Sequence, residues 1–282
     1  MIDSLKAISF TKYSGCGNDF ILVDDRQQLF PIADSEGIKR MCHRRYGVGA
    51  DGVILLQSSE DADLRMRIFN ADGYEAEMCG NGIRCLMRFA QTLGIVNEQS
   101  LVETLAGKKF VQATAEGIAV DMGIPVEMQW NLQVPTDELF EGLPLLNGLP
   151  LEVHFLNTGV PHAVLVTDNV ANIDMIAIGR YIRNHTVFAP AGTNLNAVAL
   201  EDGKVWNRTY ERGVEDETLA CGTGCVAAAL AAHRLYGLPS PVSVMTRSGQ
   251  ELQISFQVEG ESFEKVSMFG TADKIFEGSF LL

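Results

Sequence analysis

The chain has 282 residues, of which 46% are hydrophobic and 21% are charged, a balance typical of folded globular proteins rather than of disordered chains. It carries 22 Lys and Arg against 36 Asp and Glu, a formal net charge of −14 that disfavours nucleic acid and anionic membrane surfaces as partners. A chain of this length suits two domains of ordinary size.

The start of the chain and its cysteines indicate where it works. Residues 1–6 contain no cationic region followed by an apolar stretch, so no signal peptide is expected. The longest apolar run, near Val226, is shorter than the roughly 20 residues of a membrane span. The six cysteines lack the repeated C-x2-C pairs of a zinc site. We therefore expect a cytoplasmic protein with free thiols, no metal site and no membrane association.

The first half of the chain predicts four strands and a helix. Residues 7–10 and 20–23 are apolar strands on either side of a glycine turn, and residues 53–56 and 64–69 predict two more. Apolar side chains at helical spacing predict a helix that follows Gly82 and stops at Gly94.

The second half repeats one feature of the first. A helix is predicted from about Cys225 to Tyr236, closed by Gly237. It follows the turn Cys221-Gly222-Thr223-Gly224, just as the first helix follows Cys79-Gly80-Asn81-Gly82, and half the chain separates the two turns. This repeat indicates two similar α/β halves, with residues 123–125 as the linker.

The two cysteine turns indicate acid–base chemistry. A helix N-terminus presents unpaired backbone amides and a partial positive charge, so it binds carboxylates and favours the thiolate of a nearby cysteine. The glycines are expected to leave these amides open to a substrate. Two such thiols on opposite faces of one carbon can remove a proton from one face and deliver a proton to the other. No pyridoxal phosphate or nucleotide motif stands out, so no cofactor is expected.

Five blocks of the sequence, in the family's order, resemble the signature blocks of the diaminopimelate epimerase family: residues 15–20, 69–73, 78–85, 210–213 and 220–224. The resemblance implies an α/β (α+β) fold of two pseudo-symmetric domains, each a curled β-sheet or barrel around a central helix, with the active site in the cleft between them. The expected domains are residues 1–124 plus 271–282 and residues 125–270.

The resemblance also implies an activity, the epimerisation of LL-2,6-diaminopimelate to the meso isomer, on the way to lysine and peptidoglycan. Cys79 and Cys221 would be the acid–base pair, with His162 assisting Cys79 and Glu211 assisting Cys221. Neutral amides and one arginine suit a zwitterionic substrate. The implied substrate-binding positions are Asn18, Asn70, Gly80, Asn81, Asn196, Glu211, Arg212, Gly222 and Thr223.

Two positions depart from the pattern of many family members. Val160 stands where Asn is common, and Gly52 stands where Gln is common. Both are expected near the substrate, so a racemase for another amino acid, such as proline, histidine or glutamate, or one from a metallophore pathway, is an alternative. Proline racemase relatives typically carry His where Asn81 stands and lack the Asn18 and Asn70 blocks, which disfavours that reading.

Two alternatives come from other classes of protein. A thiol redox protein is disfavoured because neither cysteine of the pair lies in a C-x-x-C motif. An amino-acid-binding module without catalysis is disfavoured because both cysteines are present. Other cysteines and histidines are expected to be structural or exposed. The apolar final strand, residues 274–282, resembles a segment that pairs subunits in the family, with Phe276 in place of a common Tyr, so a homodimer is expected.

Overall fold

The computed structural model describes residues 7–136, 140 and 151–282, so residues 1–6, where no signal peptide is expected, lie outside the described part. The chain divides into two units, Met1–Asp121 with Gly270–Leu282 and Met122–Phe269, called here the first and the second unit. Each is described by itself.

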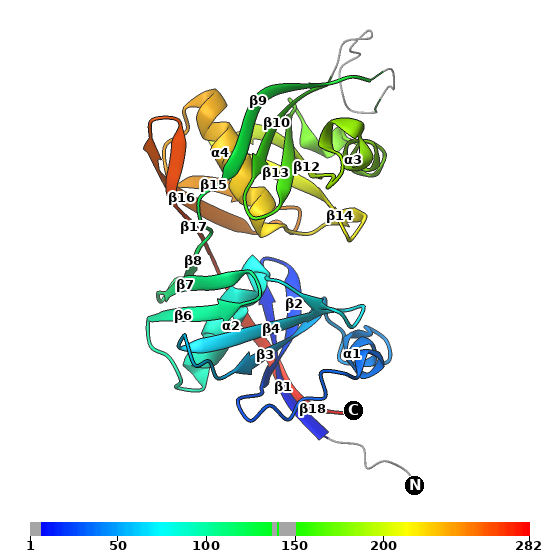
Figure 1. Cartoon of the computed structure of the whole chain (residues 1–282), viewed down its shortest axis with the longest axis vertical. Coiled ribbons are helices and arrows are strands. Elements are labelled where there is room, and N and C mark those ends of the chain that lie inside the picture. The colour runs from blue at the N-terminus through cyan, green and yellow to red at the C-terminus, as the bar shows by residue number, and fades with distance from the viewer. Residues whose placement is uncertain (1–6, 137–139, 141–150) are drawn as a thin grey trace. The chain divides into compact units, whose positions relative to one another are not determined.

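The first unit is a mixed sheet with two helices (Figure 1). Its strands pair in the order β18, β1, β2, β3, β4, β6, β7, β8, and β5 forms a short hairpin with β4. The strands are β1 (Ala7–Gly15), β2 (Asn18–Asp24), β3 (Gly52–Gln57), β4 (Leu64–Asn70), β5 (Glu75–Ala76), β6 (Gln99–Thr104), β7 (Gly107–Ala113), β8 (Ile118–Asp121) and β18 (Asp273–Leu281), and the helices are α1 (Ser35–Cys42) and α2 (Gly80–Thr92).

The second unit repeats this arrangement with strands in the order β9, β10, β11, β12, β13, β15, β16, β17, and with β14 as a hairpin partner of β13. The strands are β9 (Val126–Val134), β10 (Leu151–Asn157), β11 (Pro161–Val166), β12 (Asn194–Glu201), β13 (Lys204–Glu211), β14 (Asp216–Thr218), β15 (Val242–Met245), β16 (Glu251–Glu259) and β17 (Ser262–Gly270). The helices are α3 (Met175–Asn184) and α4 (Gly222–Tyr236), with single 3-10 turns at Val170–Asn172 and Thr186–Phe188.

The two units match strand for strand, including the direction of each pairing. β2 and β3 are parallel, as are β11 and β12, and each parallel pair is connected through a helix, α1 or α3. β4 and β6 are parallel through α2, as β13 and β15 are through α4. The expected pseudo-symmetric α/β fold is therefore confirmed.

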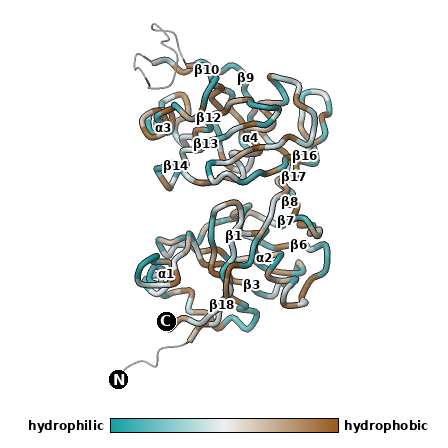
Figure 2. Tube along the Cα trace, turned by 180° about the vertical axis from the view of Figure 1, so that it is seen from behind, coloured by the Kyte–Doolittle hydropathy of each residue, from teal (hydrophilic) through white to brown (hydrophobic). Residues whose placement is uncertain are grey.

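Each sheet curls around its second helix. α4 packs against six strands of the second unit, and its residues from Gly224 to Ala232 are all buried (Figure 1). A helix that is apolar on every face belongs inside a fold. α2 packs in the same way against strands of the first unit, among them β3, which is buried along its length and apolar from Val53 to Leu56 (Figure 2).

The predicted elements are present, but both central helices begin earlier than expected. α2 starts at Gly80 and α4 at Gly222, so the glycines of each turn form the first helical turn. Glycine's low helix propensity hid this from a periodicity argument. α4 ends as predicted, at Gly237 in the left-handed conformation (φ 68°), whose amide donates to the carbonyl of His233. None of the helices in the described part has both the length and the apolar character for a membrane span.

Candidate active site

Each of the two cysteines is the N-cap residue of its central helix. Cys79 (φ −138°, ψ 119°) and Cys221 (φ −120°, ψ 113°) are extended, and the chain becomes helical at the next residue. The Sγ atom of Cys79 accepts a hydrogen bond from the amide of Gly82 at 3.4 Å. An amide donor at a helix N-terminus stabilises negative charge on sulfur.

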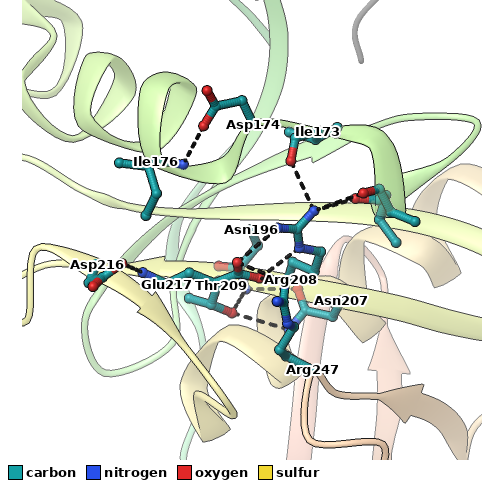
Figure 3. Close-up of polar contacts among 12 residues, drawn as sticks. Ile173, Asp174, Ile176, Asn196, Asn207, Arg208, Thr209, Asp216, Glu217 and Arg247 are labelled. Atoms are coloured by element: carbon teal, nitrogen blue, oxygen red, sulfur yellow. Dashed lines mark hydrogen bonds and ion pairs between the residues drawn. The ribbon is translucent and has the colours of Figure 1, made fainter. Parts of the chain in front are cut away.

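A short hairpin clamped by an ion pair leads into each cysteine turn. In the first unit Arg67 of β4 binds Glu75 of β5 with two hydrogen bonds of 2.6 and 2.7 Å. In the second unit Arg208 of β13 binds Glu217 of β14 at 2.6 and 2.8 Å, and Arg247 joins the same carboxylate (Figure 3). These bidentate pairs are partly shielded from solvent and fix the hairpin that precedes each cysteine by three residues.

A chain of hydrogen bonds fixes the turn at Cys79. The guanidinium of Arg84, which is completely buried, donates to Oδ1 of Asn81 at 2.9 Å and to the carbonyl of Gly80 at 3.3 Å. Because Oδ1 of Asn81 faces this cation, its Nδ2 faces Asn18 and donates to it at 2.6 Å. Asn18 in turn donates to the carboxylate of Asp51 at 3.0 Å.

Asn70 differs from these tied amides. Asn70 is exposed at the end of β4, and its backbone forms hydrogen bonds with Gly73 and Tyr74 in the turn that follows. Asn70 is therefore exposed to solvent, whereas the side chains of Asn18 and Asn81 are fixed by hydrogen bonds.

In the second unit, a line of hydrogen bonds runs from Cys221 into the core. Sγ of Cys221 lies 3.4 Å from Oγ1 of Thr223, and this hydroxyl group lies 2.9 Å from Nε2 of His162. The other ring nitrogen, Nδ1, lies 2.7 Å from Oδ1 of Asn196. His162 thus contacts the turn of Cys221, and its predicted assistance to Cys79, which belongs to the other unit, stays a prediction.

Asn196 is fully buried on β12 and is held on every side. Its Nδ2 donates to Oδ1 of Asn207 at 2.9 Å and to Oγ1 of Thr209 at 2.8 Å, both on β13 (Figure 3). Since its Oδ1 faces His162, all its polar atoms have protein partners. Contact between Asn196 and a substrate stays a prediction.

Burial shifts the pKa of three groups at or near Cys221 in the second unit. It raises the pKa of the Cys221 thiol well above its usual range, and the negative charge of Glu211 raises it further. Burial also raises the pKa of the Glu211 carboxyl. Burial lowers the pKa of His162 to about 4, although the hydrogen bond that His162 donates to Oδ1 of Asn196 acts to raise it. Burial therefore favours the neutral thiol of Cys221 and the neutral imidazole of His162, while a hydrogen bond from the Gly224 amide, and one from Thr223 when its hydroxyl group donates, act in the opposite sense at Cys221.

Arg212 is placed by Asn194, a residue that the sequence did not single out. Oδ1 of Asn194 accepts the backbone amide of Arg212 at 2.7 Å, and its Nδ2 donates to the carbonyl of Pro161 at 2.8 Å. The guanidinium of Arg212 donates to the carbonyl of Ala191 at 3.0 Å. The available signal was strand alternation, because Asn194 and Asn196 lie two residues apart on one face of β12.

The second glycine of each cysteine turn is closely packed. A Cβ atom on Gly82 would lie 2.8 Å from Cδ1 of Ile54, and one on Gly224 would lie 2.5 Å from Nδ2 of Asn196. These glycines therefore admit buried neighbours, and the expected role of the turn glycines in keeping amides open to a substrate stays a prediction. Gly52 is similar, because its Cβ would lie 2.5 Å from the carbonyl oxygen of Phe69, so a side chain there would require this part of the sheet to shift.

The family model of diaminopimelate epimerase matches residues 10–128 and 154–275. The chain belongs to the diaminopimelate epimerase family. It is 38% identical to the diaminopimelate epimerase of Aquifex aeolicus, over 96% of this chain and 97% of that one. It is 42% identical to that of Methanothrix thermoacetophila, over 97% of this chain and 96% of that one.

Several solved structures share the fold of this epimerase at low sequence identity. A phenazine biosynthesis protein of the PhzF family from Bacillus anthracis matches with a TM-score of 0.78 at 18% identity, covering 99% of this chain and 100% of the other. A hydroxyproline epimerase from Agrobacterium vitis matches with a TM-score of 0.69 at 15% identity, covering 98% and 93%. Family membership makes the chain an amino-acid epimerase of the kind that works without pyridoxal phosphate.

Proposed function

We propose that this protein interconverts LL- and meso-2,6-diaminopimelate with Cys79 and Cys221 as its two proton-transfer groups. The observation that carries the proposal is that these two cysteines cap equivalent helices in two units of the same topology. One thiolate removes the α-proton from one face, and the other thiol protonates the opposite face. Supply of meso-diaminopimelate to lysine and peptidoglycan synthesis in the cytoplasm is part of the proposal, and the six free cysteines suit a reducing compartment.

The remaining residues take roles by charge and position. The amides of Gly80-Asn81 and Gly222-Thr223, in the first turns of α2 and α4, bind the α-carboxylate as a helix N-terminus binds anions. The resemblance assigns His162 to assist Cys79, and this role is part of the proposal although both ring nitrogens of His162 contact Asn196 and Thr223 here. Glu211, whose pKa burial raises, assists Cys221. The distal amino-carboxylate end of the substrate is bound by Asn18, Asn70, Glu211 and Arg212, and Asn196, whose polar atoms all have protein partners, supports the site from within the core.

Deuterium exchange tests this proposal directly. In deuterated buffer, starting from one isomer, early product carries solvent deuterium while recovered substrate keeps its proton, because two separate bases do not share the abstracted proton. Cys79→Ala and Cys221→Ala each abolish epimerisation, whereas Cys42→Ala, the same change in a buried cysteine of α1, retains it. Proton NMR with each isomer is the measurement. Epimerisation at near wild-type rate by either Cys79→Ala or Cys221→Ala overturns the proposal.

A second candidate is a racemase for a different amino acid. Val160 favours it, because an apolar side chain stands there in place of an amide common in the family. Gly52 does not favour it, because the packing of β3 against β4 already accounts for a glycine there. Loss of the α-proton signal in deuterated buffer across a panel of amino acids separates the two, since diaminopimelate exchanges fastest only under the first proposal.

A further inference from the structure

The orientation of one amide in the second unit fixes the direction of a whole line of hydrogen bonds. Nδ2 of Asn196 is committed to two acceptors, Oδ1 of Asn207 and Oγ1 of Thr209. Its Oδ1 therefore faces Nδ1 of His162, 2.7 Å away, and can only accept. Nδ1 of His162 must carry the proton.

The tautomer of His162 determines what the hydroxyl group of Thr223 does. A neutral imidazole with its proton on Nδ1 has a bare Nε2, which accepts. Oγ1 of Thr223 lies 2.9 Å from this nitrogen, so its single hydrogen is donated there. Towards Sγ of Cys221, 3.4 Å away, the same oxygen is left to accept from S–H.

We infer that Asn196 is a positioning residue which, through His162 and Thr223, keeps Cys221 as the protonated thiol of the catalytic pair. The amides of Gly82 and Gly224 favour the thiolates of Cys79 and Cys221 respectively, so the line through Thr223 is what sets Cys221 apart. In the direction in which Cys79 removes the α-proton, epimerisation needs Cys221 as the thiol, and the line through Thr223 favours that state. The catalytic consequence rests on the proposed function, whereas the direction of the hydrogen bonds does not.

Other charged and titratable groups also act on this line. Glu211 on β13 and Cys225 on α4 both oppose the thiolate of Cys221, and Arg212 opposes the imidazolium of His162. Burial acts in the same sense on both groups. These influences favour a neutral thiol beside a neutral imidazole, whereas the Gly224 amide, which lowers the pKa of Cys221, and the hydrogen bond to Asn196, which raises the pKa of His162, act the other way.

The variant Asn196→Asp is expected to reverse the direction of the hydrogen bonds that run from His162 through Thr223 to Cys221. A carboxylate on Nδ1 favours the imidazolium, with the added proton taken from solvent, so that Nε2–H donates to Oγ1 of Thr223. The hydroxyl hydrogen then turns to Sγ of Cys221 and stabilises the thiolate. A new negative charge acting only through space has the opposite sign, because it disfavours the thiolate. The sign of the change therefore separates the two effects.

The measurement is the pH dependence of iodoacetamide alkylation at Cys221, followed by peptide mass spectrometry in the presence of a phosphine reductant. We expect Asn196→Asp to lower the apparent pKa of Cys221 by about one unit, which makes alkylation about tenfold faster below that pKa. The drop disappears in the Asn196→Asp/Thr223→Val double variant and persists with Thr223→Ser, which keeps the hydroxyl group. A raised or unchanged pKa in Asn196→Asp overturns the inference.

If the Asn196→Asp variant does not fold, a measurement on the wild-type protein tests the same inference. Nitrogen-15 NMR at neutral pH is expected to show protonated Nδ1 and bare Nε2 for His162, and the opposite tautomer or an imidazolium overturns the inference. Neither readout uses turnover. A protein that epimerises no amino acid, yet shows the expected tautomer and alkylation shift, loses the proposed function and keeps the hydrogen-bond assignment.

Discussion

The side-chain amide of Asn81 donates to Oδ1 of Asn18 across 2.6 Å and so ties the first turn of α2 to the start of β2. Its own Oδ1 accepts from the completely buried Arg84. One side chain thus satisfies a buried cation and orients a predicted substrate-binding amide.

Asn81→Ala removes both interactions at once. We expect the free energy of unfolding to fall by about 1.5–3 kcal/mol, because a buried charged donor loses an acceptor, and KM to rise because Asn18 is no longer oriented. Denaturant unfolding and steady-state kinetics measure the two effects. Asn97→Ala, at an exposed asparagine, is the control. Unchanged stability of Asn81→Ala would remove Asn81 from this role.

The two packed glycines respond differently to an added methyl group. At Gly224 the new atom meets the Asn196 amide, which is held by three hydrogen bonds, whereas at Gly82 it meets the movable end of Ile54. We expect Gly224→Ala to lose about 1–3 kcal/mol of stability, as overpacked sites do, and Gly82→Ala to lose less. Thermal unfolding of the pair is the measurement, and the reverse order would contradict the packing argument.

Asn70→Ala and Arg212→Ala affect turnover more than stability. The Asn70 residue is exposed, and the Arg212 guanidinium donates to one carbonyl, so neither supports the core. A charged hydrogen bond to substrate contributes about 1.5–3 kcal/mol, roughly one to two decades in kcat/KM. Arg212→Lys, which keeps charge but loses the bidentate geometry, is expected to fall between wild type and Arg212→Ala. Full activity at unchanged melting temperature would take either residue out of the site.

The buried neutral state of His162 makes stability depend on pH. Its pKa is about 4 in the folded chain and about 6.5 when unfolded, so between these values the unfolded state binds more protons. Stability therefore falls as pH drops through this window, by on the order of 3 kcal/mol from this group. His162→Gln should flatten that slope in urea unfolding at pH 6.5 and pH 4. Parallel wild-type and variant curves would refute the assignment.

We propose that β18 pairs two copies of the chain. It lies beside β1 at the edge of the first unit's sheet, and Ile275, Phe276 and Leu281 are 56%, 46% and 56% exposed. Long apolar edge strands favour pairing with another chain. Light scattering at micromolar concentration should give a dimer mass, and the Ile275→Glu/Phe276→Lys double variant a monomer mass. Leu105→Glu, at a similarly exposed leucine, is the control. A monomer mass for the wild type would reject the proposal.

The sequence predicted the elements whose signal is local. The repeated C-G-x-G turn indicated two equivalent helices, and the alanine-rich run of α4 indicated burial on all faces. Both follow from spacing and side-chain type alone. The family resemblance named Cys79, Cys221 and their surrounding residues for the same reason, since each lies in a continuous block.

Long-range partners could not be read in this way. The contact of His162 with Thr223 depends on where β11 lies relative to the start of α4, and the burial that raises the Cys221 pKa arises only after packing. Asp51 acts through Asn18, which is far from it in the sequence. Arg84 acts through Asn81 within α2, where the helical pattern gives no sign of the contact. Hydrogen-bond direction depends on a complete network, which no single motif contains.

The pairing of β1 with β18 affects the order in which the protein can be built. Ala7 lies opposite Leu281, so the first unit receives one of its sheet strands only after the whole second unit has been synthesised. The second unit is continuous in sequence and can complete its sheet during translation, ahead of the first. Until β18 has been synthesised, the edge of β1 that will pair with it keeps its backbone amides and carbonyls unpaired. During this interval another strand can pair with that edge by mistake.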